Sequence, residues 1–242
     1  MAGDDRLVVG GVPAQAVNSF SLRLSRRTEV VCIEPHPHVQ LLDGVVTVES
    51  VEEGQWRALA ASRRRLNSEA TSMLLGERPV WDMGIRGEGQ IVGIGDTGLD
   101  VFHCFFVDLV RPSTFDSKSR KVVEYRAYAD SLPQSSNRDH GTHVVGTAIG
   151  AASAAFSSVE AEKHKGIAPA GKVSFQDISR GESGVLEVPE NLKDDYLLWD
   201  YDRGARVLSL SWGIDTNAYT EQTADVDRFM REHNDALVVV AG

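Results

Sequence analysis

The chain has 242 residues, of which 42% are hydrophobic and 7% aromatic, and this composition is typical of a globular protein with one large or two modest domains. Its formal net charge of −10 at pH 7 argues against a binding surface for nucleic acid or an anionic membrane, because both need clustered Lys and Arg side chains. The apolar runs are far shorter than the ~20 residues that cross a bilayer, so we expect no membrane segment in this chain. The N-terminal sequence also lacks the basic and apolar pattern of a signal peptide, and the compartment stays unassigned.

The N-terminal third of the chain divides into two segments of different composition. Residues 1–48 contain an apolar run at 30–33, a Pro-rich break and a second short apolar run, and this pattern predicts a small β-containing unit. Residues 49–76 are rich in Glu, Arg, Ser and Ala, with a basic run that ends at Arg65. Two interpretations of this run stay open, a processing site within a linker and an exposed face of a helix. We expect the domain boundary within or just after this segment.

From residue 77 onward, short apolar runs alternate with segments of helical periodicity. In the last helical segment, Val226, Phe229 and Met230 recur at helical spacing. Short buried strands that alternate with helices predict an α/β fold, in which helices cover both faces of a parallel sheet. The expected strands are 90–95, 172–176, 207–210 and 236–241, and the expected helices are 143–155, 190–203 and 220–234.

Asp96 stands where the chain leaves the first of these strands, between Gly95 and Gly98. Catalytic groups of open α/β sheets collect at the carboxyl ends of strands, and an Asp there is able to orient an imidazole. A helix cap or a turn is the alternative role for an Asp at such a junction. The segment Gly93–Gly98 also fits the G-x-G-x-x-G pattern of nucleotide-binding loops, although Asp96 would place a negative charge where that loop holds a pyrophosphate.

His140 begins a segment of small residues that is suited to a helix packed against the sheet. A His in this place is able to present one ring nitrogen to Asp96 and the other to a nucleophile, which is the arrangement of a general base. His143 forms a His-x-x-His pair with His140, but the spacing and the missing Glu do not fit a zinc site. We therefore predict no metal site here.

Residues 91–100 and 138–147 resemble the Asp and His blocks of the subtilisin-like serine peptidases, or subtilases (peptidase family S8), in which the triad order is Asp, His, Ser. Residues 166–169 and 209–213 resemble two further blocks of this family in the expected order. The resemblance implies a parallel-sheet, helix-flanked subtilisin-like domain over residues 77–242 that is incomplete, because the Ser block would follow residue 242. It also implies that residues 1–48 are part of a small α+β propeptide.

The resemblance implies a serine endopeptidase in which Asp96 orients His140 and His140 activates the downstream Ser, so the chain as given is expected to be inactive. Ser211, Trp212 and Gly213 are the implied substrate-binding residues of one cleft wall, and Gly184 that of the opposite wall. The implied partners are a peptide or protein substrate and the chain's own propeptide, acting as an intramolecular inhibitor. The resemblance is compatible with a secreted or vesicular location, but no signal peptide is visible and the compartment stays unassigned.

No cofactor is expected. Calcium occurs in the family, but its usual loop is replaced here by residues 151–165, and Phe105 stands where a calcium-binding Asp is common. Cys32 and Cys104 are each expected to be small buried residues rather than nucleophiles. Two alternative functions stay open: a non-catalytic peptide-binding protein that keeps only the cleft, and a nucleotide-binding domain that uses Gly93–Gly98.

Overall fold

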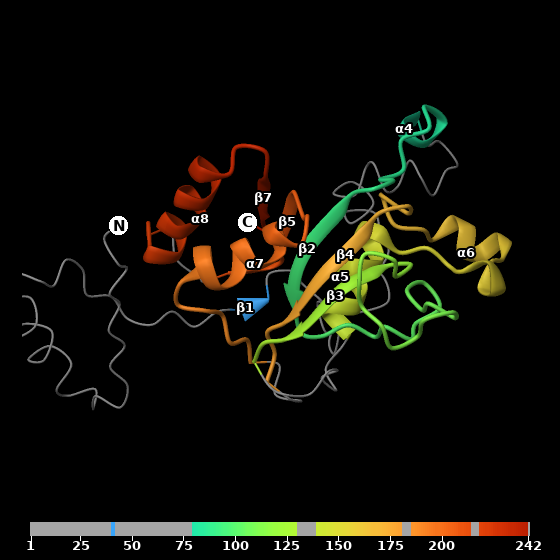
Figure 1. Ribbon diagram of the computed structural model, residues 1–242, viewed down its shortest axis with the longest axis horizontal. Coiled ribbons are helices and arrows are strands. Elements are labelled where there is room, and N and C mark those ends of the chain that lie inside the picture. Colours follow the sequence, from blue (N-terminus) through green and yellow to red (C-terminus); the bar gives the residue numbers. More distant parts are fainter. Residues whose placement is uncertain (1–39, 42–78, 130–138, 181–184, 214–217, 242) are drawn as a thin grey trace, which may run out of the picture. The chain divides into compact units, whose positions relative to one another are not determined.

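The computed structural model describes residues 40–41, 79–129, 139–180, 185–213 and 218–241 (Figure 1). The predicted boundaries at residues 48 and 76, together with Arg65, Cys32 and Gly184, lie outside the described residues.

Five strands form a parallel sheet in the order β3-β4-β2-β5-β7. This arrangement confirms the predicted α/β fold, and four of the strands correspond to the four predicted ones. The remaining strand, β3, was not predicted. The bounds are β2 (Ile91–Asp96), β3 (Val122–Ala127), β4 (Lys172–Asp177), β5 (Val207–Leu210) and β7 (Leu237–Val240).

Helices connect the strands, and one of them begins as a π-helix. The segment expected to be helical at 190–203 contains this π-helix, η4, followed directly by α7, and the segment expected at 220–234 contains α8. The helix after β3, α5, begins and ends earlier than the predicted segment 143–155. The bounds are α4 (Pro79–Asp82), α5 (Asp139–Ile149), η2 (Ala154–Phe156), α6 (Val159–Lys163), η4 (Lys193–Leu197), α7 (Leu198–Asp202) and α8 (Glu221–Glu232).

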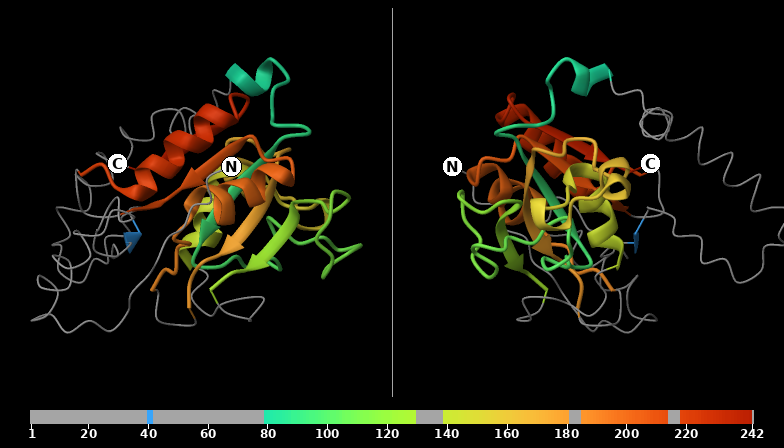
Figure 2. Two further views of the ribbon diagram at one scale, coloured as in Figure 1. Left: turned by 60° about the vertical axis from the view of Figure 1, so that its left-hand side comes forward. Right: turned by 90° about the vertical axis from the view of Figure 1, so that its right-hand side faces the viewer.

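The two faces of the sheet carry separate cores, because successive side chains of a strand point to opposite faces. Ile94 of β2 packs in the core that includes Val145 and Ile149 of α5. Leu208 of β5 belongs to the other core, with residues of η4, α7 and α8 such as Leu197. Figures 1 and 2 show α7 and α8 on one side of β2 and α5 on the other.

A second, two-stranded sheet joins distant parts of the sequence. Strand β1 (Gln40–Leu41) pairs antiparallel with β6 (Trp212–Gly213), which directly follows β5 along the chain. Gln40 is opposite Gly213, and Leu41 is opposite Trp212. A segment from the N-terminal third therefore lies along the backbone that follows β5.

Candidate active site

Asp96 and His140 meet at the carboxyl end of β2. Asp96 is the last residue of that strand and is fully buried, and His140, in the first turn of α5, is 7% exposed. The Nδ1 atom of His140 lies 2.7 Å from Oδ1 and 2.9 Å from Oδ2 of Asp96. Because a carboxylate only accepts hydrogen bonds, this contact favours the tautomer with the proton on Nδ1 and leaves Nε2 as the basic nitrogen.

The close approach of α5 to the end of β2 depends on a glycine after the histidine. A Cβ atom at Gly141 would lie 2.3 Å from the carbonyl oxygen of Gly98 and 3.0 Å from the Cβ of Asp96. The backbone N–H of Gly141 donates to the hydroxyl of Thr97 at 3.2 Å, which ties the start of α5 to the residue after Asp96. The glycine thus allows His140 to come within hydrogen-bond distance of Asp96.

Two further donors bind the carboxylate of Asp96. The backbone N–H of Thr97 donates to Oδ1 at 2.6 Å, and the hydroxyl of Ser211 donates to Oδ2 at 2.7 Å. The contact between Ser211 and Asp96 was not predicted from the sequence. A partial signal for it exists, because Ser211 directly follows a predicted strand, β5, which the structure places beside β2.

The predicted substrate-binding residues lie beside this pair. Ser211 is 8% exposed and Trp212 3% exposed, and the indole N–H of Trp212 donates to the carbonyl oxygen of Gly95 at 3.0 Å. Both side chains are therefore engaged with the end of β2. The backbone of Trp212 and Gly213 forms β6 and pairs with β1. The substrate-binding role of Ser211, Trp212 and Gly213 stays a prediction. Because the indole of Trp212 is engaged with Gly95, this residue would bind substrate through its backbone.

The sequence model of the Subtilase family matches residues 87–242. This chain belongs to the subtilase family. The match confirms the family that the Asp and His blocks predicted, and it makes the chain part of a family of serine proteases. The sheet described above is the parallel, helix-flanked sheet expected from that resemblance.

Relatives of this subtilase are much longer than the chain itself. It is 38% identical over 164 residues to the serine protease/ABC transporter B family protein tagA of Dictyostelium discoideum, covering 66% of this chain and 9% of the relative. It is 36% identical over 168 residues to the serine protease/ABC transporter B family protein tagB of the same organism, and this match covers 66% of this chain and 8% of the relative. The solved structure of the CspB protease of Clostridium perfringens matches with a TM-score of 0.49 and 21% identity, covering 67% of this chain and 38% of that one.

A buried polar cluster lies on the face of β2 opposite Asp96. Asp200 of α7 is fully buried and accepts hydrogen bonds from the hydroxyl of Ser174 at 2.5 Å and from Nε2 of Gln176 at 2.9 Å. Burial raises the pKa of Asp200 to about 7, and the two hydrogen bonds oppose this change. A Cβ at Gly93 would lie 2.8 Å from the Asp200 side chain, so the glycine makes room for the carboxyl group. The sequence analysis missed this cluster.

The nucleotide-binding alternative finds no support in this geometry. A Cβ at Gly95 would lie 1.9 Å from the hydroxyl of Tyr196, and Asp200 covers Gly93, so side chains of the subtilase itself cover both glycines on that face. The carboxylate of Asp96 lies on the other face, bonded to His140. A pyrophosphate would meet this buried carboxylate in place of open backbone N–H groups.

Within the part of the chain that the structure describes, no group of three or more His, Cys, Asp or Glu side chains is placed to hold a metal ion. His143 is exposed, whereas the ring of His140 faces Asp96. Among the described helices, none has both the length and the apolar character needed to cross a membrane.

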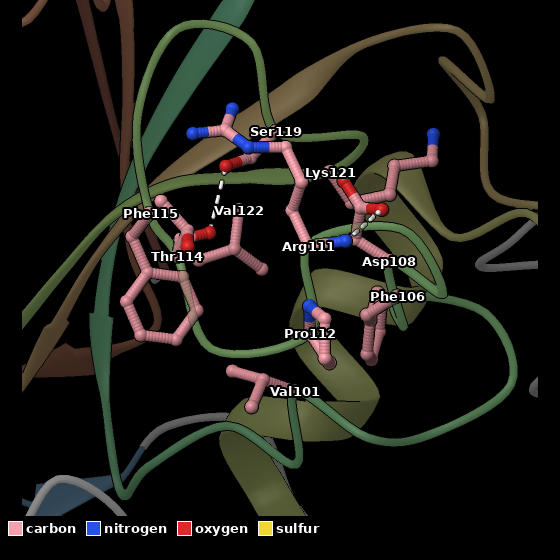
Figure 3. Close-up of a pocket in the computed structure, with 10 residues that line it drawn as sticks. All are labelled: Val101, Phe106, Asp108, Arg111, Pro112, Thr114, Phe115, Ser119, Lys121 and Val122. Atoms are coloured by element: carbon pink, nitrogen blue, oxygen red, sulfur yellow. Dashed lines mark hydrogen bonds between the residues drawn. The ribbon is translucent and has the colours of Figure 1, made fainter.

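A small pocket lies in the connection between β2 and β3 (Figure 3), and neither Asp96 nor His140 is among the residues that line it. Its volume of about 10 Å³ is room for a single water molecule. Hydrogen bonds inside this connection shape it, among them those from the backbone N–H of Arg111 to Asp108 and from the Ser119 hydroxyl to the carbonyl of Thr114. Its size makes it part of the packing of this connection rather than a substrate site.

Proposed function

We propose that this subtilase chain is the part of a serine endopeptidase that supplies the Asp and the His of a Ser-His-Asp triad. The observation that carries the proposal is the contact between Nδ1 of His140 and both carboxylate oxygens of Asp96 at the carboxyl end of a buried parallel strand. The nucleophilic Ser is assigned to sequence that follows residue 242 in the full-length protein. The tagA and tagB relatives, of which the chain spans less than a tenth, support this assignment.

In the proposed mechanism, Nε2 of His140 removes the proton from the Ser hydroxyl as its oxygen attacks the carbonyl carbon of the scissile peptide bond. His140 then donates that proton to the leaving amine, and the acyl group stays on the Ser oxygen. Water, activated by the same nitrogen, hydrolyses the acyl-enzyme. Asp96 stabilises the imidazolium that forms in each step, and its complete burial strengthens this electrostatic interaction.

We assign the substrate class to extended peptides that pair with the backbone of Trp212 and Gly213. The pairing of β1 with β6 supports this assignment, because it is an antiparallel strand addition on the same backbone. Recognition through main-chain hydrogen bonds tolerates many side chains, so the class is broad. By the same argument, the segment that includes Gln40–Leu41 acts as an intramolecular inhibitor that blocks this backbone.

The proposal is tested with the full-length protein, whose intact mass and C-terminal peptides first establish whether a Ser block follows residue 242. Hydrolysis of a fluorogenic peptide library and labelling by a serine-reactive fluorophosphonate are then compared between the wild type and Asp96→Asn. We expect a loss of roughly 10⁴-fold in kcat for Asp96→Asn. The proposal is wrong if the protein ends at Gly242, or if the wild type hydrolyses peptides as slowly as the variant.

A non-catalytic peptide-binding protein is the second candidate, and the observation that favours it is again the β1–β6 pairing, which needs no nucleophile. The two candidates differ in one measurement. A peptide-binding protein retains peptide affinity and shows no turnover in its full-length form, whereas the protease shows both.

A further inference from the structure

The strand that carries Asp96 extends past the end of its pairing with β5. The ladder between β2 and β5 joins residues 92–94 to residues 207–209, while on the other side β4 pairs with β2 as far as Asp96. Gly95 and Asp96 therefore lie beyond the last pair on the β5 side. The buried carbonyl oxygen of Gly95 and the buried carboxylate of Asp96 accept from donors outside this ladder, whereas the carbonyl oxygen of Asp96 accepts from the N–H of Ile178.

Two consecutive side chains supply these donors. The Ser211 hydroxyl binds the carboxylate of Asp96 at 2.7 Å, and the Trp212 indole N–H binds the carbonyl oxygen of Gly95 at 3.0 Å. This carbonyl belongs to the peptide unit that ends at the nitrogen of Asp96. A donor on it restricts the rotation of the peptide plane, and the plane determines where the Asp96 side chain leaves the backbone.

The indole ring is itself held in place. Trp212 is 3% exposed, and its ring meets that of Tyr196 edge-on, with 5.7 Å between the ring centroids and 85° between the planes. Tyr196 is 1% exposed and lies directly on Gly95, where no Cβ would fit. The ring of Trp212 therefore cannot turn away from Gly95 without disrupting a packed core.

We propose that Trp212 is a positioning residue for the Asp96–His140 pair: its indole N–H holds the Gly95 carbonyl and so directs the Asp96 carboxylate toward His140. Because the backbone of Trp212 also forms β6, one residue connects the binding of an extended peptide to the orientation of the carboxylate. This connection rests on the proposed function, whereas the positioning of Asp96 does not.

The test is Trp212→Phe in the 242-residue chain, which removes the N–H and keeps an aromatic ring. The readout is the downfield proton NMR signal of the His140 Nδ1–H, assigned by its loss in His140→Ala. We expect Trp212→Phe to move this signal upfield or to lose it through exchange with solvent. The proposal is overturned if the signal keeps its wild-type position.

Trp81→Phe is the matched control. Trp81 is also buried, at 6% exposed, and its indole N–H donates to the carbonyl of Ile167 at 2.9 Å, so the control loses an equivalent hydrogen bond that does not involve β2. We expect it to leave the His140 signal in place. An equal change in both variants would show a general loss of packing and would overturn the positioning role.

A wild-type measurement covers the case in which Trp212→Phe does not fold. The indole N–H signals of Trp212 and Trp81 are followed in a pH titration in which the ring signals of His140 are recorded at the same time. We expect the Trp212 signal to shift together with the ring and the Trp81 signal to stay constant. A Trp212 signal that does not respond would overturn the proposal.

Turnover gives a separate readout in the full-length protein. There we expect Trp212→Phe to lower kcat by about 10- to 100-fold, because a small misplacement of a catalytic group is costly, with KM little changed. Active-site titration corrects for any loss of folded enzyme, and an unchanged kcat would overturn the proposal. The NMR measurements need no turnover, so a protein without protease activity would refute the proposed function and still leave the positioning of Asp96 testable.

Discussion

Lys121 places its ammonium group on the carbonyl oxygen of Ile149, the last residue of α5, at a distance of 2.7 Å. The same nitrogen donates to the carbonyl oxygens of Pro169 and of Gly171, the latter at 3.1 Å, so it joins the end of α5 to the chain that leads into β4. Lys121 is 3% exposed, and the nearby charges of Arg120, Lys165 and Lys172 are all positive. The helix that carries His140 is thus fixed at its far end by a buried amine, whose protonated form also interacts favourably with the helix dipole.

Lys121→Met should destabilise the fold, and the effect should grow with pH. Burial lowers the pKa of Lys121 to about 7 from its usual 10.5, so between these values the unfolded chain binds more protons than the folded one. The free energy of unfolding of the wild type therefore increases, through Lys121, as pH rises from about 7 to about 10.5. The variant has no titrating group at this position and does not show this increase.

We expect Lys121→Met to cost about 1–3 kcal/mol near pH 6, because three carbonyls lose their donor, and more at pH 9. Urea unfolding at both pH values measures the difference. Lys118→Met, at an exposed position of the same connection, is the control and should show no such trend. A constant difference between wild type and Lys121→Met would contradict the prediction.

Asp200→Asn should show the opposite pH dependence. The pKa of Asp200 is raised by burial to about 7 from 3.8, so the folded chain binds more protons than the unfolded chain between these values. The wild type thus loses stability through Asp200 as pH rises from about 4 to about 7, and an amide does not. We expect Asp200→Asn to be more stable relative to the wild type at pH 8 than at pH 5.

The exposed neighbour Asp202 provides the control for this measurement. Asp202→Asn should differ from the wild type by a similar amount at pH 5 and pH 8, as measured by thermal or urea unfolding. If Asp200→Asn behaved in the same way as Asp202→Asn, the raised pKa of Asp200 would be refuted.

Gly95→Ala should disturb the end of β2. The added methyl group would lie 1.9 Å from the Tyr196 hydroxyl, so η4 or the strand must move, and overpacking of this kind costs about 1–3 kcal/mol. Gly146→Ala on α5 is the control, because its nearest contact is Phe106 at 3.7 Å and alanine favours a helix. We expect the melting temperature to fall for Gly95→Ala and to stay the same or rise for Gly146→Ala. Equal melting temperatures of the two variants would argue against the close contact between Gly95 and Tyr196.

Ser211→Ala should lower turnover by the full-length enzyme without preventing folding. The Asp96 carboxylate would lose the donor on Oδ2, and we expect kcat to fall by about 10-fold because the orientation of the pair becomes looser. Ser209→Ala on the same segment is the control, since Ser209 lies in β5 opposite Ile94 rather than beside the carboxylate. Equal kcat values in the two variants would show that the hydroxyl of Ser211 is not needed.

The sheet was predictable where a strand has a short, mainly apolar sequence. Strands β2, β5 and β7 have such sequences, although β7 at the edge of the sheet is largely exposed, and Asp96 at the end of β2 followed from the position of the first run. Strand β3 was missed because Glu124 and Arg126 interrupt its sequence, and these polar side chains are tolerated on an edge strand that pairs only with β4. The end of α5 was missed because the N–H of Ala151 leaves the helix and binds the carbonyl of Phe105.

In the candidate site, Asp96 and His140 were predictable as a pair because both belong to short blocks with characteristic neighbours. The burial of Asp200 was not predictable, because its partners Ser174 and Gln176 are far away in sequence and meet it only after β4 and α7 have packed. The same holds for the contact of Trp212, a predicted substrate-binding residue, with the carbonyl of Gly95, because the two residues are more than a hundred positions apart in the sequence.

The pairing of β1 with β6 has a consequence for any peptide that binds in trans. Because both strands belong to one polypeptide, the competitor is present at an effective concentration that does not change on dilution and that reaches the millimolar range for short tethers. A free peptide with the same affinity for this backbone must be present at a concentration above that effective concentration before it displaces Gln40–Leu41. A peptide that binds more weakly needs a proportionally higher concentration. Under the proposed inhibitory role, dilution would leave the backbone of Trp212 and Gly213 occupied. One cut between residues 41 and 79 would turn the unimolecular equilibrium into a bimolecular one, so that dilution would then release this backbone.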